Sequence, residues 1–251
     1  MQEKQSDLLS FAIKLAKESA KILLKDHKKA RIVKYKGKGD FALDADYKSE
    51  QHIMKRINEK YPQHDILTEE TGHHHKKSDY LWIIDPLEGT INYSHHLPIW
   101  AVNIGLFYKN KPFIGVVYAP VIKEFFYAMK GKGAYLNGKR IHVNNDTEIN
   151  KSFFAVSPKV FCADLISKNL TRRLGCAGIE LSYVACARFG ANIKMHGTDP
   201  YGYGAGSIIV LEAGGKITDT KGKEWNLKSD GAVASNGKLH DKLLKILGNI
   251  S

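Results

Sequence analysis

The sequence predicts a mixed α/β (α+β) protein whose helices and sheets form a layered αβαβα sandwich. Two observations support this prediction: helical patterns near both ends of the chain, and a central series of short apolar segments separated by turn residues. Strands joined by short turns favour hairpins over repeated βαβ units, so the first sheet is expected to be mostly antiparallel. With 251 residues, the chain is long enough for one domain with a sizeable core.

Two helices are expected before the first strands of this sheet. Within residues 6–25, apolar side chains recur at helical spacing, at Leu9, Ile13, Ala16, Ala20 and Leu23. A second helix is expected over residues 48–59, because apolar residues share one side there and a proline follows at position 62. The polar stretch 34–46 between the two helices predicts a loop or hairpin that carries Asp40, Asp44 and Asp46.

The remaining elements follow in order along the chain. Five short apolar runs predict strands, at residues 65–68, 80–84, 101–108, 113–119 and 124–129. The second half predicts helices near 179–187, 204–213 and 238–247, with strands at 216–219 and 231–235. Two layers of sheet with helices between and outside them are the simplest packing of these elements.

The composition limits the class of function. The chain has 38 Lys+Arg against 26 Asp+Glu, a net charge of +12 that attracts anions and so suits a phosphorylated substrate or nucleic acid. The basic residues form no dense block, so we interpret them as a solvated surface and do not expect nucleic-acid binding.

No apolar run approaches membrane-spanning length, and we expect no membrane association. Three cysteines without a C-x-x-C pair and a polar N-terminus predict a cytoplasmic protein without a disulfide framework.

The most informative segment for chemistry is the strand and loop at residues 80–90. An apolar strand ends at Asp85 and Pro86, and Glu88, Gly89 and Thr90 follow. Two carboxylates at a strand end are the hard oxygen ligands that magnesium prefers, and a glycine lets backbone N–H groups approach a phosphate closely. The alternative is an ordinary turn, since Asp-Pro and Glu-Gly are common in turns.

Motifs spread over nearly the whole chain support the chemical interpretation. WIIDPLEGTINY at 82–93 resembles the WIIDPxDGTxNF signature of the inositol monophosphatase family, which includes nucleotide 3′-phosphatases and fructose-1,6-bisphosphatases. DILTEETG at 65–72 resembles the GEE segment of that family, and residues 40–46 are similar to its D-x-V-T-x-x-D motif. Residues 204–215 resemble its A-G-x-x-I-x-x-E-A-G-G helix and turn.

The resemblance implies a metal site in the first half of the chain. Glu69, Asp85 and the backbone carbonyl of Leu87 would bind a first Mg²⁺, and Asp85 would bridge to a second ion. Glu88 is expected to be a ligand as well, with altered geometry or through a water. We expect one phosphatase domain over 1–251, with the metal site in a half of about 1–145 and the substrate pocket completed by about 146–251.

The resemblance also implies catalytic and phosphate-binding residues. Thr90 and Asp46 would orient and help to deprotonate a metal-bound water that attacks phosphorus in line. Gly89 and Thr90 would bind the phosphate through backbone N–H groups. No covalent nucleophile is implied.

Two residues depart from the pattern of the family. Glu88 stands where the signature has Asp, which adds one methylene to a metal ligand. Gly202 stands where the family carries a metal-binding Asp. Asp199, three residues earlier, could replace that ligand, but we interpret it as a loop or helix-capping residue. The second metal is therefore expected to be weak, absent, or completed by Glu88 and substrate.

The substrate pocket is expected to include residues of the second half. Gly175, Cys176 and Ala177 match the G-x-A segment of the family, and Gly202 is assigned to the pocket edge. Lys194 appears at the position of an acidic residue that binds ring hydroxyls in inositol-specific members, and would favour a second anionic group. A plain surface lysine is the alternative.

A run of three histidines, at 73–75, was weighed as a metal site as well. It lacks the spacing that places two histidines on one helix face, so we expect an exposed loop.

Three functions remain open from the sequence. The first is hydrolysis of a small phosphate monoester, such as an inositol or sugar phosphate, by an Mg²⁺-dependent enzyme, with activity reduced by the missing ligand. The second is a 3′-phosphonucleotide or fructose bisphosphate phosphatase. The third is a degenerate phosphatase with a regulatory or RNA-associated role, which Gly202 favours. The resemblance also implies a homodimer.

Overall fold

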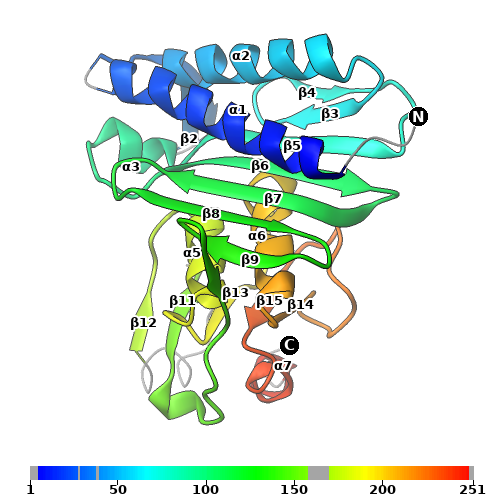
Figure 1. Ribbon diagram of the computed structural model, residues 1–251. Helices are drawn as coiled ribbons and strands as arrows, with labels where there is room; N and C mark the ends of the chain where they lie inside the picture. The colour runs from blue at the N-terminus through cyan, green and yellow to red at the C-terminus, as the bar shows by residue number, and fades with distance from the viewer. Residues whose placement is uncertain (1–4, 28, 38–39, 158–169, 249–251) are drawn as a thin grey trace.

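Helices and sheets alternate in layers through the molecule (Figure 1), in a computed structural model that describes residues 5–27, 29–37, 40–157 and 170–248. Helices α1 (Gln5–Asp26) and α2 (Asp44–Lys60) cover one face of an eight-stranded sheet. Helices α5 (Ala177–Ala185) and α6 (Pro200–Glu212) lie between this sheet and a five-stranded sheet. Helix α7 (His240–Gly248) lies at the far end of the molecule, beyond the second sheet. The predicted layered α/β architecture is confirmed.

The first two helices differ from the prediction mainly at the start of α2. The helix begins at Asp44, four residues before the predicted start, because Asp46 Oδ2 accepts a hydrogen bond from the Leu43 N–H and caps the first turn. The stretch between the helices is a hairpin of β1 (Ile32–Gly37) and β2 (Asp40–Leu43). The predicted hairpin is therefore confirmed.

The eight-stranded sheet is antiparallel except for one pair. Its strands in spatial order are β10 (Lys139–Ile141), β9 (Gly133–Leu136), β8 (Glu124–Met129), β7 (Lys111–Ala119), β6 (Ala101–Tyr108), β5 (Tyr80–Glu88), β3 (Asp65–Thr68) and β4 (Gly72–His74). Only β3 and β5 run parallel. The mostly antiparallel first sheet is confirmed, but residues 72–74 form an edge strand where a loop was predicted.

Strand β5 continues further than its sequence predicts. It extends to Glu88 through Pro86, and its pairing with β6 shifts between Asp85 and Glu88. Proline removes a hydrogen-bond donor from the ladder, so it is accommodated at such an irregularity. The short helix α3 (Thr90–Ser94) begins two residues later. The irregularity therefore lies between Asp85 and Glu88, just before the chain turns from β5 into α3.

The five-stranded sheet is mixed and belongs to the second half. Its order is β12 (Leu170–Arg172), β11 (Phe153–Val156), β13 (Ala191–Lys194), β15 (Ala232–Ser235) and β14 (Lys216–Thr218). A short 3₁₀ helix, η1 (Ile149–Lys151), leads into β11. The predicted strands near 216–219 and 231–235 are confirmed, whereas β11, β12 and β13 were not predicted.

Helix α6 lies directly on the first sheet because glycines face it there. A Cβ built on Gly115 of β7 would lie 2.2 Å from the Ala205 carbonyl oxygen, and one on Gly105 of β6 would lie 3.2 Å from Gly204. Such approaches exclude any larger residue. The glycines thus bring α6 and the end of β5 close enough to share one pocket. None of the described helices is long and apolar enough to cross a membrane.

Candidate active site

One pocket of about 420 Å³ gathers most of the predicted site residues. It is formed by the end of β5, the loop into α3, the first turns of α5 and α6, and the ends of β11 and β13. The predicted residues that line it are Glu69, Asp85, Leu87, Glu88, Gly89, Thr90, Gly175, Cys176, Ala177 and Lys194. The wall also includes Asp199, together with Arg173 and Glu180, which the sequence analysis did not identify.

Asp85 is a buried carboxylate of the pocket whose pKa is affected by the nearby carboxylates of Glu69 and Glu88. Its side chain accepts a hydrogen bond from the Leu87 N–H at 3.1 Å, and the residue is 4% exposed. Burial raises the pKa of Asp85 well above its ordinary value, and the charges of Glu69 and Glu88 raise it further. The pocket therefore holds carboxylates that are close enough to raise the pKa of one another.

Glu69 is paired with a lysine from the β1–β2 hairpin. Lys36 Nζ lies 2.7 Å from one carboxylate oxygen of Glu69 and 2.7 Å from one of Glu70. The pKa of Glu69 is still raised, because burial outweighs the attraction to the lysine. Two further carboxylate oxygens, Glu50 Oε1 and Glu70 Oε2, are buried and have no hydrogen-bond partner. Around Glu69 the carboxylate oxygens outnumber the hydrogen-bond donors, so a bound cation would be stabilised there.

The donor chemistry fits a divalent cation. Carboxylates and a backbone carbonyl are hard oxygen ligands. Burial and, after it, the neighbouring carboxylates raise the pKa of Asp85, and a cation would offset both effects. Among the residues that the structure describes, no three pocket carboxylates bring ligand atoms within 4.8 Å of one another. The side chain of Lys36 supplies the positive charge at Glu69 in this arrangement.

Thr90 and Asp46 lie together at the edge of the site. The Thr90 hydroxyl lies 3.1 Å from the Leu87 carbonyl oxygen and 3.4 Å from Asp46 Oδ1. A hydroxyl has a single proton, so these two acceptors compete for it. Burial raises the pKa of Asp46 to about 7, and the charges of Glu70 and Glu69 add to the shift. Asp46 is therefore suited to exchange a proton near neutral pH.

Glu88 is held at the back of the pocket by three donors. Its Oε2 accepts from Asn103 Nδ2 at 2.7 Å, from the Gly178 N–H at 2.8 Å and from Cys176 Sγ at 3.0 Å. Its Oε1 faces Gly202, where an added Cβ would lie only 2.6 Å away. The additional methylene of glutamate therefore places the carboxylate in the space that a side chain at position 202 would need.

Asp199 caps helix α6. Its Oδ1 accepts a hydrogen bond from the Gly202 N–H at 2.6 Å, and the helix begins at Pro200. Its Oδ2 lies 3.5 Å from Lys194 Nζ. The helix-capping interpretation of Asp199 is confirmed, and α6 starts four residues before its predicted start because of this cap.

Gly89 adopts a backbone conformation that favours glycine. Its φ of 87° lies in the left-handed region, and a Cβ there would meet the Ile99 carbonyl oxygen at 3.1 Å. The residue precedes Thr90, so the chain turns sharply from β5 into α3 beside the pocket. A side chain at this position would be strained and crowded at the same time.

A second buried acid, Glu180 of α5, lines the part of the pocket that the second half of the chain forms. Glu180 accepts hydrogen bonds from the Leu174 N–H at 2.7 Å and Asn192 Nδ2 at 2.9 Å, and Asn192 Oδ1 accepts one from the Tyr203 hydroxyl. Burial raises the pKa of Glu180 to about 7. Glu180 could have been identified from the sequence, because it is the one acidic residue in an otherwise mostly apolar segment, AGIELSYVA.

Comparisons with known proteins show the family to which this chain belongs. The family model described as "Inositol monophosphatase family" matches residues 4–251. The chain is 32% identical to "Inositol monophosphatase 3" of Solanum lycopersicum, with 95% of this chain and 96% of the relative covered. It is 34% identical to "Fructose-1,6-bisphosphatase/inositol-1-monophosphatase" of Thermotoga maritima, with 97% of each covered. It is also 34% identical to "Nus factor SuhB" of Haemophilus influenzae, with 94% of each covered.

Solved structures resemble the fold over almost its whole length. An inositol monophosphatase (IMPase) of Thermotoga maritima superposes with a TM-score of 0.91 at 32% identity, over 97% of this chain and 98% of that one. The extragenic suppressor protein SuhB of Bartonella henselae gives a TM-score of 0.90 at 27% identity, over 96% and 98%.

Proposed function

Because this chain belongs to the inositol monophosphatase family, we propose that it hydrolyses a small phosphate monoester, such as an inositol or sugar phosphate, with magnesium as its cofactor. Its relatives are phosphoric monoester hydrolases, and the family implies a divalent metal. The observation that carries the proposal is that Glu69, Asp85 and Glu88 line one pocket, where burial raises the pKa of Asp85 and the charges of the two glutamates raise it further. Such mutual repulsion is expected of a site that binds a divalent cation.

In this proposal, Glu69, Asp85 and the Leu87 carbonyl hold the cation. When bound, the cation would lower the pKa of a water and neutralise charge on the phosphate. Lys36 would then release Glu69 and keep its ion pair with Glu70, since its Nζ lies 2.7 Å from both carboxylates.

Thr90 and Asp46 act as the proton-accepting pair. Asp46, with a pKa of about 7, takes up a proton near neutral pH, and the Thr90 hydroxyl lies between it and the Leu87 carbonyl. Gly89 and the first turn of α3 direct backbone N–H groups at the phosphate, because the left-handed turn at Gly89 opens that side of the chain to the pocket.

We propose that one metal position is strong and a second is weak or absent. Both candidates for the second position are engaged by hydrogen-bond donors. Glu88 accepts from three groups through Oε2, and Asp199 accepts from the Gly202 N–H and faces Lys194. A cation bound through Glu88 Oε2 or Asp199 Oδ1 would have to displace these contacts, at the cost of buried donors left unpaired.

The substrate carries its phosphate towards Gly89 and its remaining atoms towards the wall formed by Gly175, Cys176 and Ala177. Arg173 and Lys194 also line the pocket, so a bisphosphate or phosphonucleotide is the alternative substrate. Lys194 lies 3.5 Å from Asp199, which partly neutralises it, and this favours a monophosphate.

The test is phosphate release from inositol, sugar, bisphosphate and nucleotide phosphates while Mg²⁺ is varied. The matched control is Asp85→Asn, which keeps the size of the side chain and removes its charge. Activity that rises with Mg²⁺ and disappears in the control supports the proposal. No Mg²⁺-dependent release above the control, on any substrate, contradicts it.

A second candidate function is a regulatory or RNA-associated role. The relative named "Nus factor SuhB" and the net charge of +12 favour it. Salt-dependent binding of the Asp85→Asn variant to RNA, with the affinity of the unmodified protein, would support a role that does not need catalysis.

A homodimer and a cytoplasmic location remain predictions from the family resemblance and the composition. Light scattering on the purified chain tests the first.

A further inference from the structure

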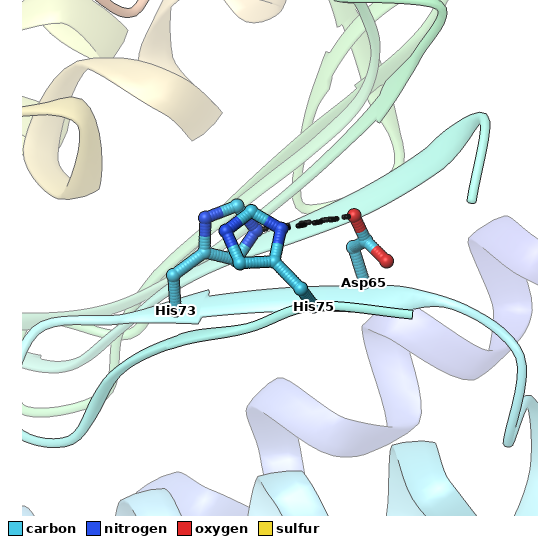
Figure 2. Close-up of side chains that lie close together, drawn as sticks. All are labelled: Asp65, His73 and His75. Atoms are coloured by element: carbon cyan, nitrogen blue, oxygen red, sulfur yellow. Dashed lines mark ion pairs between the residues drawn. The ribbon is translucent and has the colours of Figure 1, made fainter. Parts of the chain in front are cut away.

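Two histidines and an aspartate face one another at the open end of the β3–β4 hairpin (Figure 2). Asp65 begins β3, His73 lies within β4, and His75 follows β4 directly. Asp65 Oδ2 lies 3.9 Å from His73 Nε2 and 3.9 Å from His75 Nδ1. One ligand atom from each residue lies within 4.8 Å of the other two. None of the three lines the pocket described above.

The strand pairing explains why these side chains share a face. His73 pairs with Leu67 in the antiparallel β3–β4 ladder, and His74 pairs with Ile66. Side chains two residues apart in a strand point the same way, so His73 and His75 lie on the side of Asp65, and His74 points to the opposite side. Helical spacing does not bring these adjacent histidines together, whereas the alternation of side chains along a strand places two of them on one face.

The separations are close to those of a metal site. Two ligand atoms bound to one tetrahedral zinc ion at 2.0–2.1 Å lie about 3.3 Å apart. The observed 3.9 Å separations exceed this by roughly half an ångström. The rings of His73 and His75 pack with their centroids 3.4 Å apart, and the side chain of His75, which is 69% exposed, would have to turn for its Nδ1 to share an ion with the other two ligands.

Asp65 is oriented for ligation by the chain that follows β4. Its Oδ1 accepts hydrogen bonds from the Lys76 N–H at 2.6 Å and the Ser78 N–H at 3.2 Å, which leaves Oδ2 towards the two imidazole rings. Its side chain is only 11% exposed. Backbone donors that fix one carboxylate oxygen are the usual outer support of a metal-binding carboxylate.

From this geometry we propose that Asp65, His73 and His75 form a binding site for a borderline transition-metal ion, of which zinc is the representative, separate from the catalytic pocket. Imidazole nitrogens select zinc-like ions over magnesium, and a carboxylate completes a three-ligand set. The fourth position is open to water because His75 is exposed.

The experiment measures Zn²⁺ affinity and stoichiometry by competition with a chromophoric chelator, using the full chain in excess Mg²⁺. His73→Ala and His75→Ala are the test variants, and His74→Ala is the matched control, since it removes an imidazole from the other side of the same strand. Circular dichroism checks that each variant is folded. Asp85→Asn reports whether zinc occupies the pocket instead.

The expected result is one zinc equivalent in the unmodified chain, in His74→Ala and in Asp85→Asn, with affinity at least about tenfold weaker in both test variants. Equal affinity in all variants would overturn the proposal. An equal loss in His74→Ala would overturn it too, because binding would then belong to the histidine tract at large. Loss of the zinc equivalent in Asp85→Asn would assign the ion to the pocket and also contradict the proposal.

Discussion

The carboxylate of Glu88 lies where a side chain on residue 202 would begin, and residue 202 is a glycine. A Cβ on Gly202 would lie 2.6 Å from Glu88 Oε1, closer than unbonded atoms of these types approach. The two departures from the family pattern, a longer acid at 88 and a missing acid at 202, are thus parts of one arrangement. With no side chain at residue 202, Glu88 extends its Oε1 into that space while its Oε2 accepts from Asn103 and from the start of α5.

Gly202→Asp alone is expected to destabilise the protein by about 1–3 kcal/mol, because it overpacks a buried site beside a second carboxylate. The double variant Glu88→Asp/Gly202→Asp is expected to lose less than the sum of the single variants. Urea unfolding of all four proteins, as a double-mutant cycle, measures this coupling. Additive losses would mean that the two positions do not share space. Calorimetric titration with Mg²⁺ should detect a second equivalent in the double variant.

Thr90→Ala is expected to lower kcat by about 10²–10⁴-fold with little change in KM, because it removes the hydroxyl between Asp46 and the Leu87 carbonyl. Thr90→Ser keeps the hydroxyl and is the matched control. Steady-state kinetics on the best substrate tests the pair. A kcat in Thr90→Ala equal to that of the serine variant would exclude a role for the hydroxyl.

Lys36→Gln is expected to tighten Mg²⁺ binding, because the lysine competes for Glu69 and its positive charge repels a divalent ion. The same change should destabilise the metal-free protein, since Glu69 and Glu70 lose their shared partner. Calorimetry with Mg²⁺ and thermal unfolding in a chelator measure the two effects. Weaker Mg²⁺ binding in Lys36→Gln would show that the lysine supports the site.

The metal-free protein is expected to lose stability as the pH rises from about 4 to about 7. Burial raises the pKa of Glu180 and of Asp46 to about 7, from ordinary values of 4.5 and 3.8. A carboxyl whose pKa is raised by folding binds its proton more tightly in the folded state. Its stabilising contribution is therefore full below the unfolded pKa and is lost as the pH passes the folded pKa.

Glu180→Gln should flatten this pH dependence, since it removes one of the two groups. Urea unfolding with a chelator at several pH values between 4 and 8 measures the slopes. An unchanged slope would mean that Glu180 does not titrate in this range. The Asp79→Asn variant, which changes an exposed acid, is a suitable control.

The turn that carries the proposed phosphate-binding residues, and the cap of α6, followed from local signals. An apolar strand that meets proline after Asp85 and then reaches Gly89 predicts a strand end and a sharp turn. The turn at Gly89 is confirmed, although β5 continues through Pro86 to Glu88. Asp199 was interpreted as a cap from its residue type, and it caps α6. Signals of this kind act within a few residues, so the sequence carries them directly.

Lys36 and Glu180 could not be assigned to the pocket in the same way. Lys36 reaches Glu69 across 33 residues. Glu180 meets Asn192, which in turn accepts from the Tyr203 hydroxyl, only after α5 and α6 pack between the sheets. The glycines of β6 and β7 that permit this packing have no local signature of their contact with α6. Long-range contacts depend on which elements become neighbours.

The sequence by itself determined the layered fold and the turn at Gly89, because hydrophobic periodicity and turn chemistry are local properties, and its motifs indicated the family by resemblance. Only the tertiary structure decided where the carboxylate of Glu88 goes, since that depends on Asn103, Gly178 and the empty side of Gly202. It also decided that His73 and His75 face Asp65, because strand register, which the sequence leaves open, selects the side chains that share a face.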